Sequence, residues 1–355
     1  MSARELSYCP RARRATSSLT CALWFRLAPS QRAAPSILGV ALAFSVGGCH
    51  GEIVTIGEKP APTYHFANCR LVVELAAYAR TNNATLTEDL LEIFFTSTRD
   101  EDDFDIWTAS RAGRYDVFGP PQKVRTVSSG RFDTGSAISA DGLTLWLASD
   151  RRSMGGSSNG GLDIWVSTRA ARGADWSEPA LVPSLNSSSF DIPRPPGLNG
   201  LVMPLGSERG PGSVYRTFFA SRASTTAPFE TPQTVPELVF EGTTTMDTFM
   251  SNDGLTLFYA SGPVPLSNEG GLPSGLDAGA GGPQPDVTTP VLTADLFVAR
   301  RENATDPFAG FAQITDLNTL FEERDPWLSE DKTQFYFSSD RGGNLNIYTC
   351  DVIFK

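Results

Sequence analysis

The chain has 355 residues, of which 40 are acidic and 29 basic, so its formal net charge is −11. This excess of negative charge repels phosphate backbones and excludes nucleic acid as the expected partner. Hydrophobic residues make up 40% of the chain and include 22 Phe, which is enough for a substantial core. With 32 Gly, 25 Pro and only 19% charged residues, the composition favours many short strands and turns.

Histidine is scarce, since His50 and His65 are the only two in the chain. The main domain therefore cannot contain a Ser-His-Asp triad, a Cys-His dyad or a multi-histidine metal site. The acidic run at 100–103 lacks the spacing of a calcium-binding loop and indicates a solvated surface. The sequence predicts no catalytic residue, no metal site and no cofactor.

The amino terminus has the pattern of an export signal. The apolar run at 37–46 is too short to span a bilayer as a helix, and Arg26 and Arg32 precede it. The residues that follow, Gly47-Gly48-Cys49, resemble with Val46 the bacterial lipobox, in which the cysteine is acylated and becomes the first residue. The alternative is an ordinary cleaved signal in which Cys49 is incidental. The expected organisation is a lipoprotein signal peptide over 1–48, a linker over 49–68 and a main domain over 69–355.

Lipidation of Cys49 would place the protein at a membrane of the bacterial cell envelope, because a buried acyl chain contributes about 0.8 kcal/mol per CH₂. Residue 50 is His and not the Asp that retains lipoproteins in the inner membrane of enteric bacteria. The outer membrane is therefore favoured, with the main domain in the periplasm or at the cell surface.

A strand-and-turn unit recurs five times along the main domain. The clearest copies, 141–149 and 253–261, begin with Asp-Gly and continue as an apolar strand ending in Ser. A second strand opens with Asp and an apolar-aromatic pair, as in Asp163-Ile164-Trp165, and a third strand ends each unit. Weaker copies of the first strand lie at 88–97, 199–207 and 330–339.

Such regular short strands, separated by Gly and Asp turns, indicate an all-β repeat. The strands are nearly continuous apolar runs, so both faces of each sheet should be covered, as they are in a propeller blade. We expect a single β-propeller of five blades. Six blades are possible if 190–243 contains additional strands, and an open solenoid or a two-sheet sandwich is the alternative architecture.

The recurring residues resemble the TolB-type, WD-like β-propeller repeats of bacteria over roughly residues 70–355. Asp325-Pro326-Trp327-Leu328-Ser329, the run at 337–343, and Ser149-Asp150-Arg151 carry the resemblance. It implies a non-catalytic platform that binds an envelope protein, peptide or glycan at its channel face. The alternative is a glycan-active enzyme of the five-bladed type, which needs two or three unique carboxylates converging in the channel.

Repeated Asp and Arg residues favour a structural role, in which each Arg clamps adjacent strands or blades. Arg99, Arg151, Arg209 and Arg341 follow the first strand of their units. The Asp residues that open the units are a separate case, because they would start the innermost strands and ring one mouth of the channel. We consider a ligand or cation site there, formed by Asp133, Asp191, Asp247 and Asp325.

The last unit lacks its outer strand, and the missing strand occurs near the start of the domain. Residues 72–75 match 235–238, which end the third unit, so the amino-terminal strand is expected to complete the last blade. Cys69 would then lie beside Cys350 in the neighbouring strand, within disulfide range. We predict a Cys69–Cys350 bond, and two buried free thiols are the alternative.

The fourth unit is interrupted at 262–294, between its two central strands. This segment is rich in Gly, Pro and Ala and is expected to be a disordered, dispensable surface loop. A binding loop is the alternative.

Overall fold

The computed structural model describes residues 64–77, 79–100, 103–152, 161–264 and 293–354, together with two short strands nearer the amino terminus. The chain divides into two units, Met1–Ala61 and Pro62–Lys355. In the first unit, β1 (Ala41–Leu42) pairs antiparallel with β2 (Ile53–Val54). The predictions for the signal peptide, for Cys49 and for residues 265–292 lie outside the described residues.

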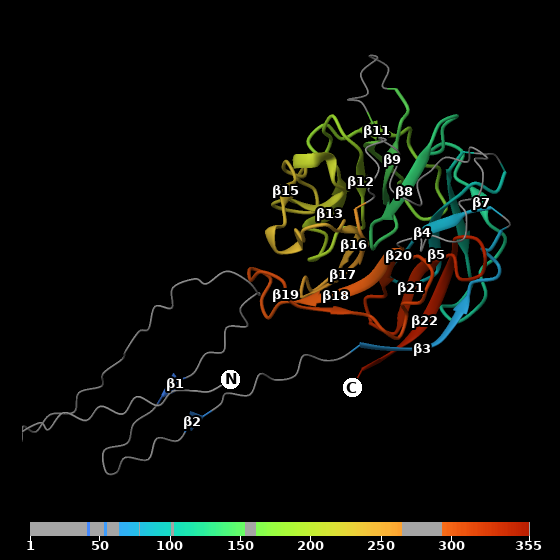
Figure 1. The fold of residues 1–355 in the computed structure, drawn as a ribbon. Helices are drawn as coiled ribbons and strands as arrows, with labels where there is room; N and C mark the ends of the chain where they lie inside the picture. The colour runs from blue at the N-terminus through green and yellow to red at the C-terminus, as the bar shows by residue number, and fades with distance from the viewer. Residues whose placement is uncertain are drawn as a thin grey trace, which may run out of the picture. The chain divides into compact units, whose positions relative to one another are not determined.

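The second unit is a five-bladed β-propeller, as expected from the repeats. Five four-stranded antiparallel sheets are arranged in a ring, and each blade runs from an innermost first strand to an outer fourth strand (Figure 1). Blade 1 is β4–β7, blade 2 is β8–β11, blade 3 is β12–β15, blade 4 is β16–β19, and blade 5 is β20–β22 with β3. The sixth blade considered for 190–243 does not occur, because these residues form blade 3 and its flanking connections.

The strands have the following bounds. Blades 1 and 2 contain β4 Thr81–Leu86, β5 Glu92–Ser97, β6 Asp105–Ser110, β7 Gln122–Lys123, β8 Asp133–Ile138, β9 Thr144–Ser149, β10 Asp163–Thr168 and β11 Ala180–Leu181. Blades 3 and 4 contain β12 Asp191–Pro193, β13 Val202–Ser207, β14 Arg216–Ser221, β15 Gln233–Thr234, β16 Met246–Met250, β17 Thr256–Ser261, β18 Asp295–Arg300 and β19 Ala309–Gln313. Blade 5 contains β20 Glu323–Leu328, β21 Gln334–Ser339, β22 Asn346–Phe354 and β3 Tyr64–Leu71. Two short 3-10 helices, η1 (Pro211–Ser213) and η2 (Pro236–Leu238), flank β14 and β15.

The innermost strands share an irregularity near their start. Four of them are bulged against the second strand, and one residue at the bulge, the third of β4, β8 and β20 and the second of β16, has a positive φ of 52° to 62°. Gly, Asn and Asp tolerate this left-handed conformation better than other residues. In blade 3 the third residue is Pro193, whose ring fixes φ near −65°, and β12 ends there. The four residues with positive φ are Asn83, Gly135, Asp247 and Asp325.

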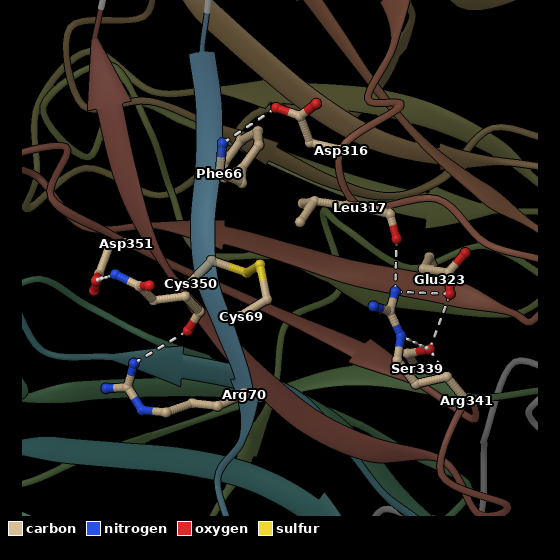
Figure 2. Close-up of a disulfide and its surroundings, with 11 residues drawn as sticks. Phe66, Cys69, Arg70, Asp316, Leu317, Glu323, Ser339, Arg341, Cys350 and Asp351 are labelled. Atoms are coloured by element: carbon tan, nitrogen blue, oxygen red, sulfur yellow. Dashed lines mark hydrogen bonds and ion pairs between the residues drawn. A yellow bond between two sulfur atoms is a disulfide. The ribbon is translucent and has the colours of Figure 1, made fainter.

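The ring closes between the two ends of the propeller, as predicted, but through residues earlier in the chain than 72–75. β3 pairs antiparallel with β22 and supplies the outer strand of blade 5, and residues 72–75 follow β3 in a turn (Figure 1). Figure 2 shows the disulfide between Cys69 on β3 and Cys350 on β22, whose Cα atoms are 4.1 Å apart. The predicted disulfide is therefore present, and it links residues separated by 281 positions in the sequence.

The described ends of the fourth-unit insertion lie side by side. Ser261, the last residue of β17, pairs with Asp295, the first residue of β18. The ladder between the two strands is therefore complete without residues 265–292, which makes the segment an insertion within one blade. Within the described ranges, no helix is both long and apolar enough to cross a membrane.

Candidate functional site

The four Asp residues expected at one channel mouth occupy two different positions in their strands. Asp133 and Asp191 are the first residues of β8 and β12, and each pairs with the last residue of the second strand. The corresponding residue of blade 5 is Glu323, which pairs with Ser339. Asp325 lies two residues after Glu323, Asp247 is the second residue of β16, and both lie at the bulge of their strand.

The first-position carboxylates bind groups of the fold itself. The Asp133 carboxylate accepts hydrogen bonds from the backbone N–H and the hydroxyl of Ser129 and forms an ion pair with Arg151 at 2.5 Å. Asp191 has the same partners in blade 3, Ser187 and Arg209. Both Asp side chains are fully buried, which is consistent with a structural role.

The same arginines connect each blade to the one before it, confirming the clamp predicted from their repetition. Arg341 donates from Nη2 to the carbonyl oxygen of Leu317 at 2.6 Å and to Glu323 at 2.9 Å (Figure 2). Its Nε donates to the Ser339 hydroxyl at 3.0 Å. Equivalent bonds to the preceding connection are made by Arg99, Arg151 and Arg209, which reach the carbonyls of Leu75, Val127 and Leu185.

The bulge-position carboxylates belong to a buried charged cluster that crosses the channel. Arg194 of blade 3 donates from Nη1 to Asp325 of blade 5 at 3.1 Å and to Asn83 of blade 1 at 2.6 Å. The backbone N–H of Asn83 donates to Asp325 at 3.1 Å. Arg324 donates from Nε to Asp247 of blade 4 at 2.9 Å. Because its members come from four blades, we call this set the channel cluster.

Burial sets the electrostatics of the channel cluster. Burial and the nearby charge of Asp247 raise the pKa of Asp325, and the opposing charge of Arg194 limits the shift. Burial alone would lower the pKa of Arg324, but the charges of Asp247 and Glu322 hold it above its ordinary value. The carboxylates of Asp325 and Asp247 lie against the guanidinium groups of Arg194 and Arg324 and balance their charge inside the ring.

Beyond the channel cluster, the channel opens as a cavity of about 340 Å³. It lies at the face where the turn between the first and second strands of each blade is found; we call this the turn face and the opening the mouth. Every blade contributes to its lining, which combines apolar walls with a polar rim. The apolar walls include Leu86, Ile138, Pro195, Phe249, Trp327 and Leu328, and the polar rim includes Glu88, Asn252, Asp253, Glu330 and Lys332.

Two of the three acidic side chains that line the mouth have partners on neighbouring turns. Asp253 forms an ion pair with Lys332 at 2.7 Å, and Glu330 accepts a hydrogen bond from Asn252 at 2.8 Å. Burial would raise the pKa of Asp253, but hydrogen bonds from Lys332 and the Ser251 hydroxyl lower it below the ordinary value. Among the described residues, no group of three or more His, Cys, Asp or Glu side chains is placed to hold a metal ion.

The fold and the mouth thus define a five-bladed β-propeller with a plugged channel and one open end. No family model and no curated protein matches the chain. Among solved structures it is similar to TolB from Acinetobacter baumannii, with 12% identity and a TM-score of 0.43 over 79% of this chain and 57% of that one. The chain therefore spans less than two thirds of that TolB chain.

Two glycosidases are among the other similar structures. The α-L-arabinofuranosidase from Podospora anserina, in complex with cellotriose, has 8% identity and a TM-score of 0.44 over 78% of this chain and 91% of that one. A family 117 glycoside hydrolase from Zobellia galactanivorans has 12% identity and a TM-score of 0.44 over 82% and 90%. These likenesses concern the fold alone.

Proposed function

We propose that the protein is a cell-envelope lipoprotein whose propeller binds a partner at the mouth and catalyses no reaction. The observation that carries this proposal is the mouth cavity, which all five blades build at the ends of their innermost strands. Apolar walls with a few polar groups at the rim are typical of a binding pocket. The partner would be an envelope protein, a peptide or a glycan.

The carboxylates of the ring support binding rather than catalysis. Glycoside hydrolysis needs two carboxyl groups at the substrate, and its general acid has a raised pKa. Asp325 and Glu322 have raised pKa values, both chiefly through burial, but each is bonded to an arginine and neither lines the mouth. At the rim, the pKa of Asp253 is shifted downward, which is opposite to what a general acid requires.

The second candidate is a glycan-active enzyme. The observation in its favour is that three acidic residues, Glu88, Asp253 and Glu330, line the mouth. A pair of them acting on a bound glycan would need no other residue type.

The entry point of the chain supports presentation of the mouth near a membrane. Tyr64, the first residue of β3, pairs with Phe354, and its hydroxyl lies 3.2 Å from that of Thr256, next to a blade 4 turn. β3 therefore begins at the turn face. If Cys49 carries the lipid, the stretch from Cys49 to Tyr64 spans at most about 50 Å, so Tyr64 would stay within that reach of the bilayer.

Photo-crosslinking in intact cells tests both parts of this proposal. A photo-reactive residue in place of Glu330, at the rim, is expected to give a discrete adduct with an envelope component. The same residue in place of Val73, in the turn that follows the opposite end of β3, should give none, although Val73 is 68% exposed. Cys49→Ala is expected to move the protein and its adduct from the membrane fraction to the soluble fraction.

Two results would contradict the proposal. Equal adducts at positions 330 and 73 would contradict binding at the mouth. Unchanged membrane association of the Cys49→Ala protein would contradict the lipid anchor.

A further inference from the structure

A groove of about 830 Å³ runs between blades 2 and 3 on the turn face. It is continuous with the mouth, because the two cavities share part of their lining. Trp146 and Phe229 lie along it, with their ring centroids 6.2 Å apart. The residues that line both cavities are Glu88, Ala140, Pro196, Asn199 and Asn252.

The corresponding space between blades 1 and 2 is closed by two ion pairs. Arg169, which follows β10, binds the carboxylate of Glu92 through both terminal nitrogens. Arg172, three residues later, binds Asp89 in the turn of blade 1. The guanidinium of Arg169 also lies over Trp176, 4.7 Å from the ring centroid.

The space between blades 5 and 1 is closed in a similar way. Arg111, which follows β6, donates from Nη2 to the amide oxygen of Gln334 at 3.5 Å. Arg114, three residues later, pairs with Asp331 in the turn of blade 5. Both interfaces thus use an arginine after the third strand, and another three residues on, to bind the preceding blade.

Blade 3 keeps the first of these arginines but lacks its partners. Arg222 donates from Nε to the carbonyl oxygen of Gly200 at 2.7 Å, and its guanidinium lies 4.4 Å from the centroid of Phe229. Thr225 takes the place of the second arginine, and Thr144 takes the place of Glu92 on the facing blade. Within the described residues, the two terminal nitrogens of Arg222 have no hydrogen-bond acceptor.

We propose that this groove binds an extended peptide segment of a protein partner, with a side-chain carboxylate of the peptide bound to Arg222. This carboxylate takes the place that Glu92 occupies against Arg169. An apolar side chain of the same segment occupies the mouth, whose walls are apolar. The inference rests on the mouth being a binding site and names the class of partner that it takes.

The charges of the groove favour a peptide that carries both signs. Asp141 lies on the wall contributed by blade 2, and its backbone carbonyl accepts a hydrogen bond from Arg172. Within the described residues its carboxylate pairs with no arginine, because Thr225 occupies the position equivalent to Arg172. Glu88, which lines both cavities, and Glu330, which lines the mouth, add negative charge. A polyanion would be repelled by these carboxylates, whereas a segment with one acidic and one basic side chain complements both walls.

The test compares the native protein with the double variant Thr144→Glu, Thr225→Arg. This variant rebuilds the closing ion pairs of blades 1 and 2 and leaves the net charge unchanged. Both proteins select binders from a library of random displayed peptides, and an enriched peptide and its Glu→Gln or Asp→Asn derivative are measured by fluorescence anisotropy. The native protein is expected to enrich sequences with an acidic residue and an apolar residue.

Neutralising that acidic residue is expected to weaken binding roughly 10- to 100-fold, the usual range for a lost charge-assisted hydrogen bond. The double variant should lose binding to a similar extent while melting no lower than the native protein. In the native background, the Arg222→Lys protein should retain more affinity for the peptide than the Arg222→Gln protein. A peptide that binds the double variant as tightly as the native protein overturns the groove inference and leaves the mouth proposal standing.

Other results also overturn the inference. Enriched peptides that contain no acidic residue would overturn it. Binding of a uronic-acid oligosaccharide by a protein that enriches no peptide would overturn it too. If no peptide is enriched, a crosslink at position 330 still supports the mouth as a binding site. Loss of that crosslink as well would contradict both proposals.

Discussion

Removal of the disulfide with Cys69→Ala and Cys350→Ala is expected to destabilise the protein by up to roughly 5 kcal/mol. The bond closes a chain of 281 residues, so it removes a large loop-closure entropy from the unfolded state. It also holds β3 as the outer strand of blade 5, and without β3 that blade would expose an edge. The measurement is urea unfolding of the variant and the native protein.

Reductant supplies the matched control for this prediction. Cys69 is solvent-exposed, so a thiol reagent can reach it, whereas Cys350 is fully buried. Reduction should lower the unfolding midpoint of the native protein to that of the variant and leave the variant unchanged. A variant that unfolds at the native urea concentration would show that the ring is held closed by strand pairing alone.

Arg194→Met is expected to destabilise the protein by about 3–5 kcal/mol at neutral pH, the usual cost of breaking a buried ion pair. Methionine roughly matches the length of the side chain but leaves Asp325 as a buried charge and leaves the Asn83 amide oxygen without its donor. The double variant Arg194→Met, Asp325→Asn should recover part of this loss. Asn retains the left-handed backbone at position 325, where φ is 52°, and removes the charge.

The pH dependence of the same variant follows from the raised pKa of Asp325. Loss of Arg194 would raise this pKa further, because burial and the charge of Asp247 would act without opposition. A carboxyl with a raised pKa in the folded state stabilises the fold below its unfolded pKa and loses that contribution as pH rises through the folded pKa. The stability difference between Arg194→Met and native protein should therefore shrink as the pH falls from neutral toward the unperturbed carboxyl pKa of about 4. A difference that stays constant with pH would show that the destabilisation does not come from the charge of Asp325.

The blades and their closure could be predicted from the sequence because they depend on local patterns. Apolar strands and the recurring Arg that binds the preceding connection appear in almost every unit, and Asp-Gly turns mark the two clearest copies, so each copy supports the others. The pairing of Cys69 with Cys350 followed from the missing outer strand of the last unit. Predicting the blades, the ring closure and the disulfide needed only the pairing of neighbouring strands.

The channel cluster could not be predicted in this way, because its members meet across the ring. Arg194 follows Pro193 in the most degenerate unit, and no repeat marks it. Its contact with Asp325 depends on the radius of the closed ring and not on local spacing. The sequence also aligned Asp133 and Asp325 as equivalents, although Asp325 is at the bulge and Glu323 occupies the first position.

The groove was missed for a different reason. At this interface Thr144 and Thr225 are in the places that Glu92 and Arg172 occupy between blades 1 and 2. An absent ion pair leaves no positive signal in a single sequence. Only the geometry of the closed interfaces, in which Arg169 binds Glu92, shows what the open one is missing.

The most direct test of the central claim, that the mouth binds without catalysing a reaction, is a turnover assay on glycans. The protein is incubated with arabinose-, xylose- and galactose-based oligosaccharides, and released reducing ends are compared with those from Asp253→Asn, Glu330→Gln protein. We expect no release above the level of the double variant, because Asp253 is held ionised by Lys332 and the channel carboxylates are bound to arginines. Release of sugar by the native protein that the double variant lacks would contradict the claim and identify a glycan-active enzyme.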